Sequence, residues 1–103
     1  MTRLIADIGG TSLRLAHQHD DGPELCDPAI MACADFATAE DAFADYCAKY
    51  KPNIDMLCLA VAGPVTGARV DITNNHWQFD AGKLAAAMNL RAYLLINDFT
   101  AQA

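Results

Sequence analysis

Two short polar segments combine residue types that could bind a phosphorylated ligand and act on it. Residues 7–11 (DIGGT) follow an apolar run near the start of the chain, and Asn97 and Asp98 follow another near its end. Consecutive glycines leave main-chain N–H groups uncovered, so the first segment can accept phosphate oxygens, and its carboxylate can hold a cation or a metal-bound water. The second segment offers an amide and a carboxylate. On these residues alone, an ordinary glycine turn and a helix cap at Asp98 remain open alternatives.

A β-hairpin is expected to present the first of these segments. Residues 4–15 contain two apolar runs on either side of the glycines, and in the second run leucines alternate with polar residues. That alternation is typical of a half-buried strand, and glycines give the turn its backbone freedom. The polar residues 17–23 then predict a turn, and a weaker third strand is expected within 28–34.

Two helices are predicted further along the chain. The first spans about 38–51, with Thr38 as its N-cap and its apolar residues on one face. The second spans about 80–89, with Asp80 as its N-cap and Asn89 as its C-cap.

Two uninterrupted apolar segments, residues 56–62 and 92–96, predict strands buried on both faces. With the helix between them they form a βαβ unit, so these strands should be adjacent and parallel. A short hairpin is expected in between, over residues 65–73, with its turn at 66–67. The chain as a whole predicts an α/β fold with a mixed sheet of about five strands, the second antiparallel to the first.

This topology brings the polar segments to one edge of the sheet. Ligands of such sheets bind outside the carboxyl ends of the strands, and three of these ends carry residues 7–11, 63–64 and 97–98. Their convergence favours a functional site over an isolated turn and an isolated cap. Neither GxGxxG nor GxxxxGK[ST] occurs, so a Rossmann dinucleotide site and a P-loop both lack their motif.

Composition excludes several other classes of protein. The 103 residues make one domain or a piece of one, and with 53% hydrophobic and 19% charged residues the chain is not disordered. The net charge is −6 and the seven basic residues are scattered, so nucleic acid is not an expected partner. The longest apolar run is too short to span a bilayer and no secretory signal is visible, so no membrane partner and a cytoplasmic location are expected.

The cysteines and histidines show no metal-binding pattern. Cysteines at positions 26, 33, 47 and 58 lack CxxC spacing and are expected to be reduced, mostly buried thiols. His17 and His19 could ligate a metal, but no third ligand lies nearby at metal-site spacing. We therefore interpret them as surface histidines.

Three stretches together resemble the N-terminal lobe of bacterial ATP-dependent glucokinases, within the sugar kinase, Hsp70 and actin superfamily. They are DIGGTSLRLA, AVAGPVTGARVDITNNHWQF and INDFTAQA, and their order and spacing cover essentially the whole chain. The resemblance implies a ribonuclease H-like (actin-like ATPase) fold and transfer of the ATP γ-phosphate to the 6-hydroxyl of glucose. It also implies ATP and Mg²⁺ as cofactors and glucose as the substrate, in glycolysis.

The resemblance assigns roles to the residues of the first segment. Gly9, Gly10 and Thr11 would lie near the ATP phosphates, as the family's first phosphate loop. Asp7 would help to place Mg²⁺, through a water.

The resemblance also assigns roles at the sugar. Asn97 would hydrogen-bond the sugar, and Asp98 would bind it and act as the catalytic base. Residues 73–77 resemble the family's TN-x-x-W, which makes Asn74 a possible sugar contact. Asn74 is equally consistent with a turn, and Trp77 with a core aromatic.

The second phosphate loop, the adenosine segment and the remaining sugar-site residues of the family belong to a downstream lobe. Residues 1–103 are therefore expected to be a truncated N-terminal small lobe that is inactive alone and can self-associate. The alternatives are a kinase for another hexose or an N-acetylhexosamine, and a non-catalytic sugar-sensing module on the same fold.

Overall fold

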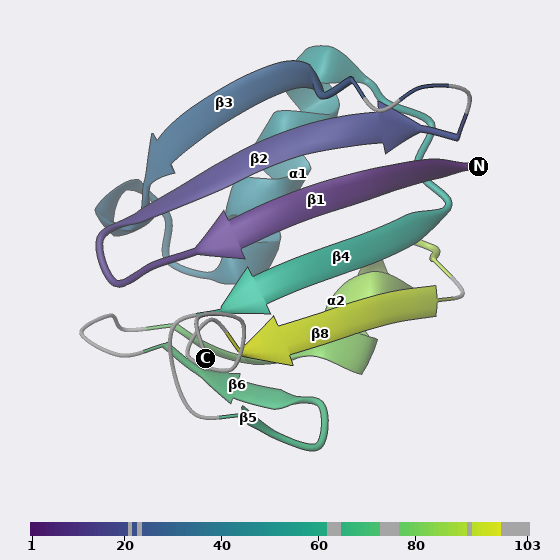
Figure 1. The fold of residues 1–103 in the computed structure, drawn as a ribbon. Coiled ribbons are helices and arrows are strands. Elements are labelled where there is room, and N and C mark those ends of the chain that lie inside the picture. Colours follow the sequence, from purple (N-terminus) through teal and green to yellow (C-terminus); the bar gives the residue numbers. More distant parts are fainter. Residues whose placement is uncertain (21, 23, 62–64, 73–76, 91, 98–103) are drawn as a thin grey trace.

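The expected hairpin lies at the centre of a mixed five-stranded sheet (Figure 1). The computed structural model describes residues 1–20, 22, 24–61, 65–72, 77–90 and 92–97. In spatial order the strands are β3 (Cys26–Ala32), β2 (Ser12–His19), β1 (Thr2–Ile8), β4 (Met56–Val61) and β8 (Ala92–Asn97). As predicted, β1 and β2 pair antiparallel and β4 and β8 pair parallel; β1 and β4 are also parallel.

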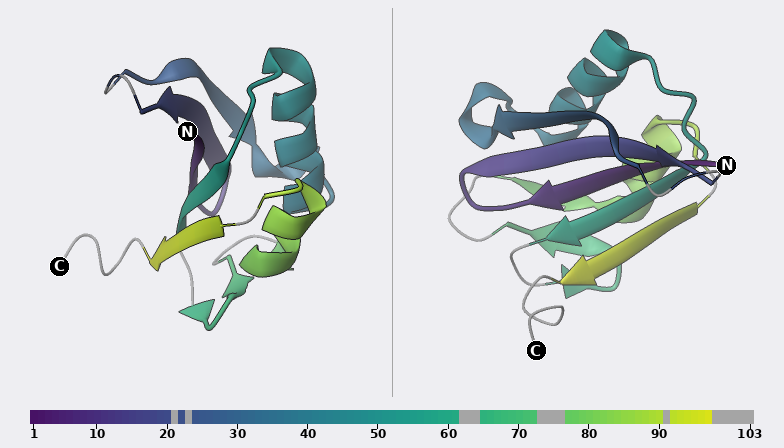
Figure 2. Two further views of the ribbon diagram at one scale, coloured as in Figure 1. Left: turned by 90° about the vertical axis from the view of Figure 1, so that its right-hand side faces the viewer. Right: turned by 45° about the horizontal axis from the view of Figure 1, so that its top comes forward.

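Both α-helices, α1 (Ala39–Tyr50) and α2 (Ala81–Ala87), cover the same face of this sheet (Figure 2). Side chains alternate between the faces of a strand, so every second residue points toward the helices. These residues form the core with one face of each helix. The largest fully buried side chains of the core are those of Trp77, Tyr46, Phe43, Leu4, Ile8, Leu13, Leu15, Leu57, Leu59, Leu84, Val61 and Val70.

The helix ends follow the predicted capping residues closely. Thr38 Oγ1 accepts a hydrogen bond from the backbone N–H of Asp41 at 3.2 Å. Asp80 Oδ1 accepts one from the N–H of Lys83 at 2.9 Å. Asn89 lies one residue beyond the C-cap of α2 rather than at it, in the left-handed conformation (φ 60°) that often ends a helix.

A second, three-stranded antiparallel sheet leads into α2. Its strands are β5 (Val65–Thr66), β6 (Arg69–Asp71) and β7 (Gln78–Asp80). The pairing of Thr66 with Arg69 puts the hairpin turn at residues 67–68, one position later than predicted. Gly67 takes φ 61° there, a conformation that glycine adopts without steric cost.

Two strand predictions were wrong in part. Residues 17–19 belong to β2 rather than to a turn, because His17 pairs with Leu4 of β1 and His19 pairs with Thr2. Neither β4 nor β8 is buried on both faces as predicted. Met56, Cys58 and Ala60 of β4 are half-buried on the side away from the helices. In β8, Tyr93, Leu94 and Ile96 are 39%, 51% and 45% exposed. No helix in the described part of the chain is long and apolar enough to cross a membrane.

The four cysteines form no disulfides, as expected, but only Cys33 is fully buried. The other three are half-buried. Burial raises the pKa of the Cys47 thiol. Burial also raises the pKa of the Cys58 thiol, and the positive charge of Arg3 offsets part of that increase.

Candidate functional site

The parallel register confirms that the carboxyl ends of β1, β4 and β8 lie side by side. Ile8 pairs with Val61, and Val61 pairs with Asn97. Neighbouring strands lie about 4.8 Å apart, so the backbones of Ile8 and Asn97 are separated by roughly 10 Å. The arrowheads of the three strands accordingly point to the same edge of the sheet (Figure 1). A ligand about 10 Å long could touch the ends of β1 and β8 together.

Asp7 lies on the face of the sheet that the helices leave open. It is exposed, and its neighbours across the strands are Arg14 of β2 and Ala60 of β4. Asp7 and Arg14 line a hollow of about 510 Å³ on this face. The carboxylate is therefore accessible, with a guanidinium group on the adjacent strand.

The Gly-Gly-Thr turn has one backbone bond of its own. Gly9 N–H donates to the carbonyl of Ser12 at 2.9 Å, and a Cβ on Gly9 would lie 3.3 Å from the same oxygen. Among the described residues, the N–H groups of Gly10 and Thr11 donate to no other backbone group. Thr11 is exposed. Two amides and a hydroxyl group are thus available where the sequence predicts phosphate contacts.

A one-turn 3-10 helix, η1 (Cys33–Asp35), anchors this turn from outside the hairpin. The N–H of Cys33 donates to the Thr11 carbonyl at 2.9 Å, and its thiol donates to the Gly9 carbonyl at 3.8 Å. Sequence reasoning missed this positioning role of Cys33. No local signal could have revealed it, because the two partners are more than twenty residues away in the chain.

Of the three residues predicted to bind the sugar, Asn97 alone lies in the described part of the chain. Asn97 ends β8 at the edge shared with β1, which fixes its backbone. Asp98 and Asn74 lie outside the described residues, so their roles stay predictions.

Trp77, in contrast, is a core aromatic, which decides between the two interpretations of that residue. Its side chain is 2% exposed, and its Nε1 donates to the Phe36 carbonyl at 3.2 Å.

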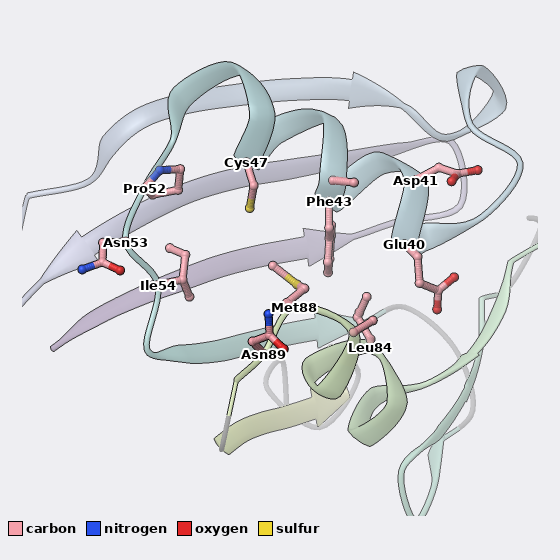
Figure 3. Close-up of a pocket in the computed structure, with 12 residues that line it drawn as sticks. Glu40, Asp41, Phe43, Cys47, Pro52, Asn53, Ile54, Leu84, Met88 and Asn89 are labelled. Carbon is pink, nitrogen blue, oxygen red and sulfur yellow. The ribbon is translucent and has the colours of Figure 1, made fainter.

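A separate cavity of about 700 Å³ lies between α1 and α2 (Figure 3). Phe43, Cys47, Leu84 and Met88 supply much of its apolar wall, with Glu40 at one end. It lies on the helix side of the sheet, whereas Asp7 faces the open side. Of the predicted site residues that the structure describes, none lines it.

Comparison with known proteins shows which protein family this sequence matches. The sequence matches the family model for glucokinase over residues 4–103. It is 37% identical over 101 residues to a glucokinase of Hahella chejuensis and 43% identical over 103 residues to one of Caulobacter sp. (strain K31). Each alignment covers 97% of this chain and 31% of the relative, so the chain spans about a third of their length.

Solved glucokinase structures also match this chain. A glucokinase from an Antarctic psychrotroph superposes with a TM-score of 0.83 at 31% identity, over 95% of this chain and 32% of that one. A ROK family glucokinase from Streptomyces griseus, solved with glucose and AMPPNP, gives a TM-score of 0.71 at 21% identity, over 95% and 33%. The second likeness bears on the fold alone.

Proposed function

The chain belongs to the glucokinase family, and on this premise we propose that it forms the N-terminal lobe of an ATP-dependent glucokinase. The whole enzyme would transfer the γ-phosphoryl group of ATP to the 6-hydroxyl of glucose, as a step of glycolysis in the cytoplasm. One observation carries the proposal. The register of β1, β4 and β8 brings the end of β1, after Asp7, and the last residue of β8, Asn97, to one edge, where a phosphate donor and a hydroxyl acceptor could meet.

The phosphate end of the site would be the turn after β1. The free amides of Gly10 and Thr11 can donate to phosphate oxygens, and Gly9 keeps side-chain atoms away from them. The exposed Asp7 carboxylate fits Mg²⁺, a hard cation that prefers carboxylate and water oxygens. When bound, Mg²⁺ would neutralise negative charge on the phosphates. Arg14 adds a fixed positive charge beside Asp7.

The sugar end would follow β8. We propose that Asn97 hydrogen-bonds the sugar and that Asp98 accepts the proton of its 6-hydroxyl as this oxygen attacks phosphorus. Asn74 is carried as a further sugar contact. Phosphoryl transfer asks little of the protein beyond positioning, charge neutralisation and this base. The relatives at 37% and 43% identity are named glucokinases, which supports glucose as the substrate.

A chimaera tests the proposal directly. Residues 1–103 would replace the matching third of the Caulobacter glucokinase, with which they share 43% identity. We expect glucose-dependent release of ADP in a coupled assay, and slower turnover with mannose and N-acetylglucosamine. A folded chimaera that binds glucose without turnover would support the sugar-sensing alternative instead.

Asp98→Asn in this chimaera separates a catalytic base from a helix cap. Loss of general-base assistance should lower kcat by at least ~10² with little change in thermal stability. Asp80→Asn is the matched control, because Asp80 caps α2 by an observed hydrogen bond and asparagine caps about as well as aspartate. If the Asp98 variant kept more than about a tenth of the activity, as the control should, the base assignment would fail.

A further inference from the structure

Two histidines and a cysteine meet at the end of β2, far from the Gly9 turn. His17 and His19 are two residues apart on this strand, so their side chains share a face. The adjacent strand β3 begins at Cys26, which pairs with His17 across the sheet. The interpretation as a surface histidine holds for His19, which is exposed, and was wrong for His17, which is only 6% exposed. A third candidate ligand, Cys26, comes from the partner strand.

The three side chains lie within reach of one ion. One ligand atom from each of His17, His19 and Cys26 lies within 4.8 Å of the other two. A bulge between the strands, where Asp27 takes φ 49°, shifts the register next to Cys26. It also brings Asp27 Oδ2 to 3.8 Å from His17 Nε2. A fourth donor is therefore at hand, on a side chain that is 48% exposed.

Hydrogen bonds orient both imidazole rings. Tyr46 donates its only hydroxyl proton to the Asp27 carbonyl at 2.9 Å, so the hydroxyl oxygen must accept from His17 Nδ1–H at 3.1 Å. This fixes the tautomer and leaves the Nε2 lone pair of His17 free. His19 Nδ1 is hydrogen-bonded to Thr2 Oγ1 at 2.8 Å, and with Nδ1–H as the donor the Nε2 lone pair of His19 is available as well. Such support is typical of histidines that ligate metals.

We propose that His17, His19 and Cys26 bind Zn²⁺, with the Asp27 carboxylate or a water as the fourth ligand. Two imidazoles and a thiolate suit a borderline transition metal, whereas Mg²⁺ and Ca²⁺ prefer oxygen. Zinc bonds of 2.0–2.3 Å in a tetrahedron put ligand atoms roughly 3.3–3.6 Å apart. The cluster therefore needs to contract by about 1 Å, which the exposed side of His19 permits.

The bound ion would join β2 to the start of β3 at the edge of the sheet. His17 lies five residues from Ser12 along β2, roughly 17 Å at the rise of an extended strand. The proposed zinc site is thus distinct from the proposed phosphate site, and each can fail alone.

The test uses the tag-free 103-residue chain after removal of metal with a chelator. Titration calorimetry with Zn²⁺ should give one site with a Kd in the micromolar range or below. Co²⁺ should give a thiolate charge-transfer band and the visible absorption of a tetrahedral site. Zinc should also protect Cys26, but not Cys58, from alkylation mapped by mass spectrometry. This last measurement needs no substitution.

Variants separate ligands from neighbours. Cys26→Ser and His19→Gln should each weaken zinc binding at least about 100-fold, and Cys26→Ser should abolish the charge-transfer band. Cys58→Ser is the matched control, because Cys58 is half-buried like Cys26 but lies on β4. Tyr46→Phe removes the hydroxyl that orients His17, and should weaken binding about 10–100-fold with the cobalt spectrum retained. Circular dichroism checks that each variant folds.

Three results would each overturn the proposal. They are a wild-type Kd above about 1 mM, equal alkylation of Cys26 with and without zinc, and folded Cys26→Ser or His19→Gln variants that bind as well as Cys58→Ser does.

Discussion

Gly9→Ala should damage nucleotide binding far more than it damages the fold. The added Cβ would lie 3.3 Å from the Ser12 carbonyl oxygen, so the turn must open by a few tenths of an ångström. Gly9 is not among the residues with positive φ, so alanine meets no backbone strain. Alanine also lowers the conformational entropy of the unfolded chain, which stabilises the folded state by about 0.4–1 kcal/mol. The net change in the free energy of unfolding should therefore stay within about 1 kcal/mol.

The cost to ATP binding is larger because the turn carries the free amides. Opening it displaces the N–H groups of Gly10 and Thr11, and a hydrogen bond to a charged group contributes about 1.5–3 kcal/mol. Losing one such bond weakens binding roughly 10- to 150-fold. We expect the KM for ATP of the chimaera to rise at least about tenfold, with the KM for glucose nearly unchanged.

Gly67→Ala provides the opposite control. Gly67 has open space around it but takes φ 61°, where a side chain costs about 1–2 kcal/mol. This variant should lose more thermal stability than Gly9→Ala and keep its KM for ATP. Melting curves and steady-state kinetics on the two proteins decide the matter. If both variants changed KM for ATP equally, or Gly9→Ala left it unchanged, the phosphate role of this turn would be refuted.

Two further predictions concern the chain alone. Residues 1–103 should show no sugar kinase activity and bind ATP·Mg²⁺ weakly, since half of a cleft cannot exclude water; micromolar binding of both ATP and glucose in calorimetry would contradict this. The chain should also self-associate through the open face of the sheet, where Ile30, Leu94 and Ile96 are 72%, 51% and 45% exposed. Light scattering should show concentration-dependent oligomers that Leu94→Lys weakens, and a wild-type chain that stays monomeric at high concentration would count against it.

The predictable parts of this fold are those that depend on nearby residues or on a general rule. Thr38 and Asp80 were recognised as caps because each bonds an N–H three residues along the chain. The adjacency of β4 and β8 followed from the βαβ rule, and it gave the shared strand edge without any knowledge of packing.

Features that depend on distant partners could not be predicted in this way. The Trp77 ring is a core aromatic because the Phe36 carbonyl, 41 residues away, accepts its N–H. The burial of β4 on one face only follows from both helices packing on the same side of the sheet (Figure 2). An apolar sequence indicates that other residues bury both faces of a strand. It does not indicate whether those residues belong to the same chain or to another polypeptide.

β2 shows why one sheet can hold two separate chemistries. Its first residue, Ser12, closes the glycine turn, and its last, His19, belongs to the proposed zinc site. The turn leaves amides unpaired because two glycines interrupt the ladder, so it suits an anion. At the other end the ladder continues past a bulge in the partner strand, which puts Cys26 opposite His17. Anion binding thus depends on backbone left unpaired, whereas cation binding depends on side chains that pairing aligns, and substitutions can test each without disturbing the other.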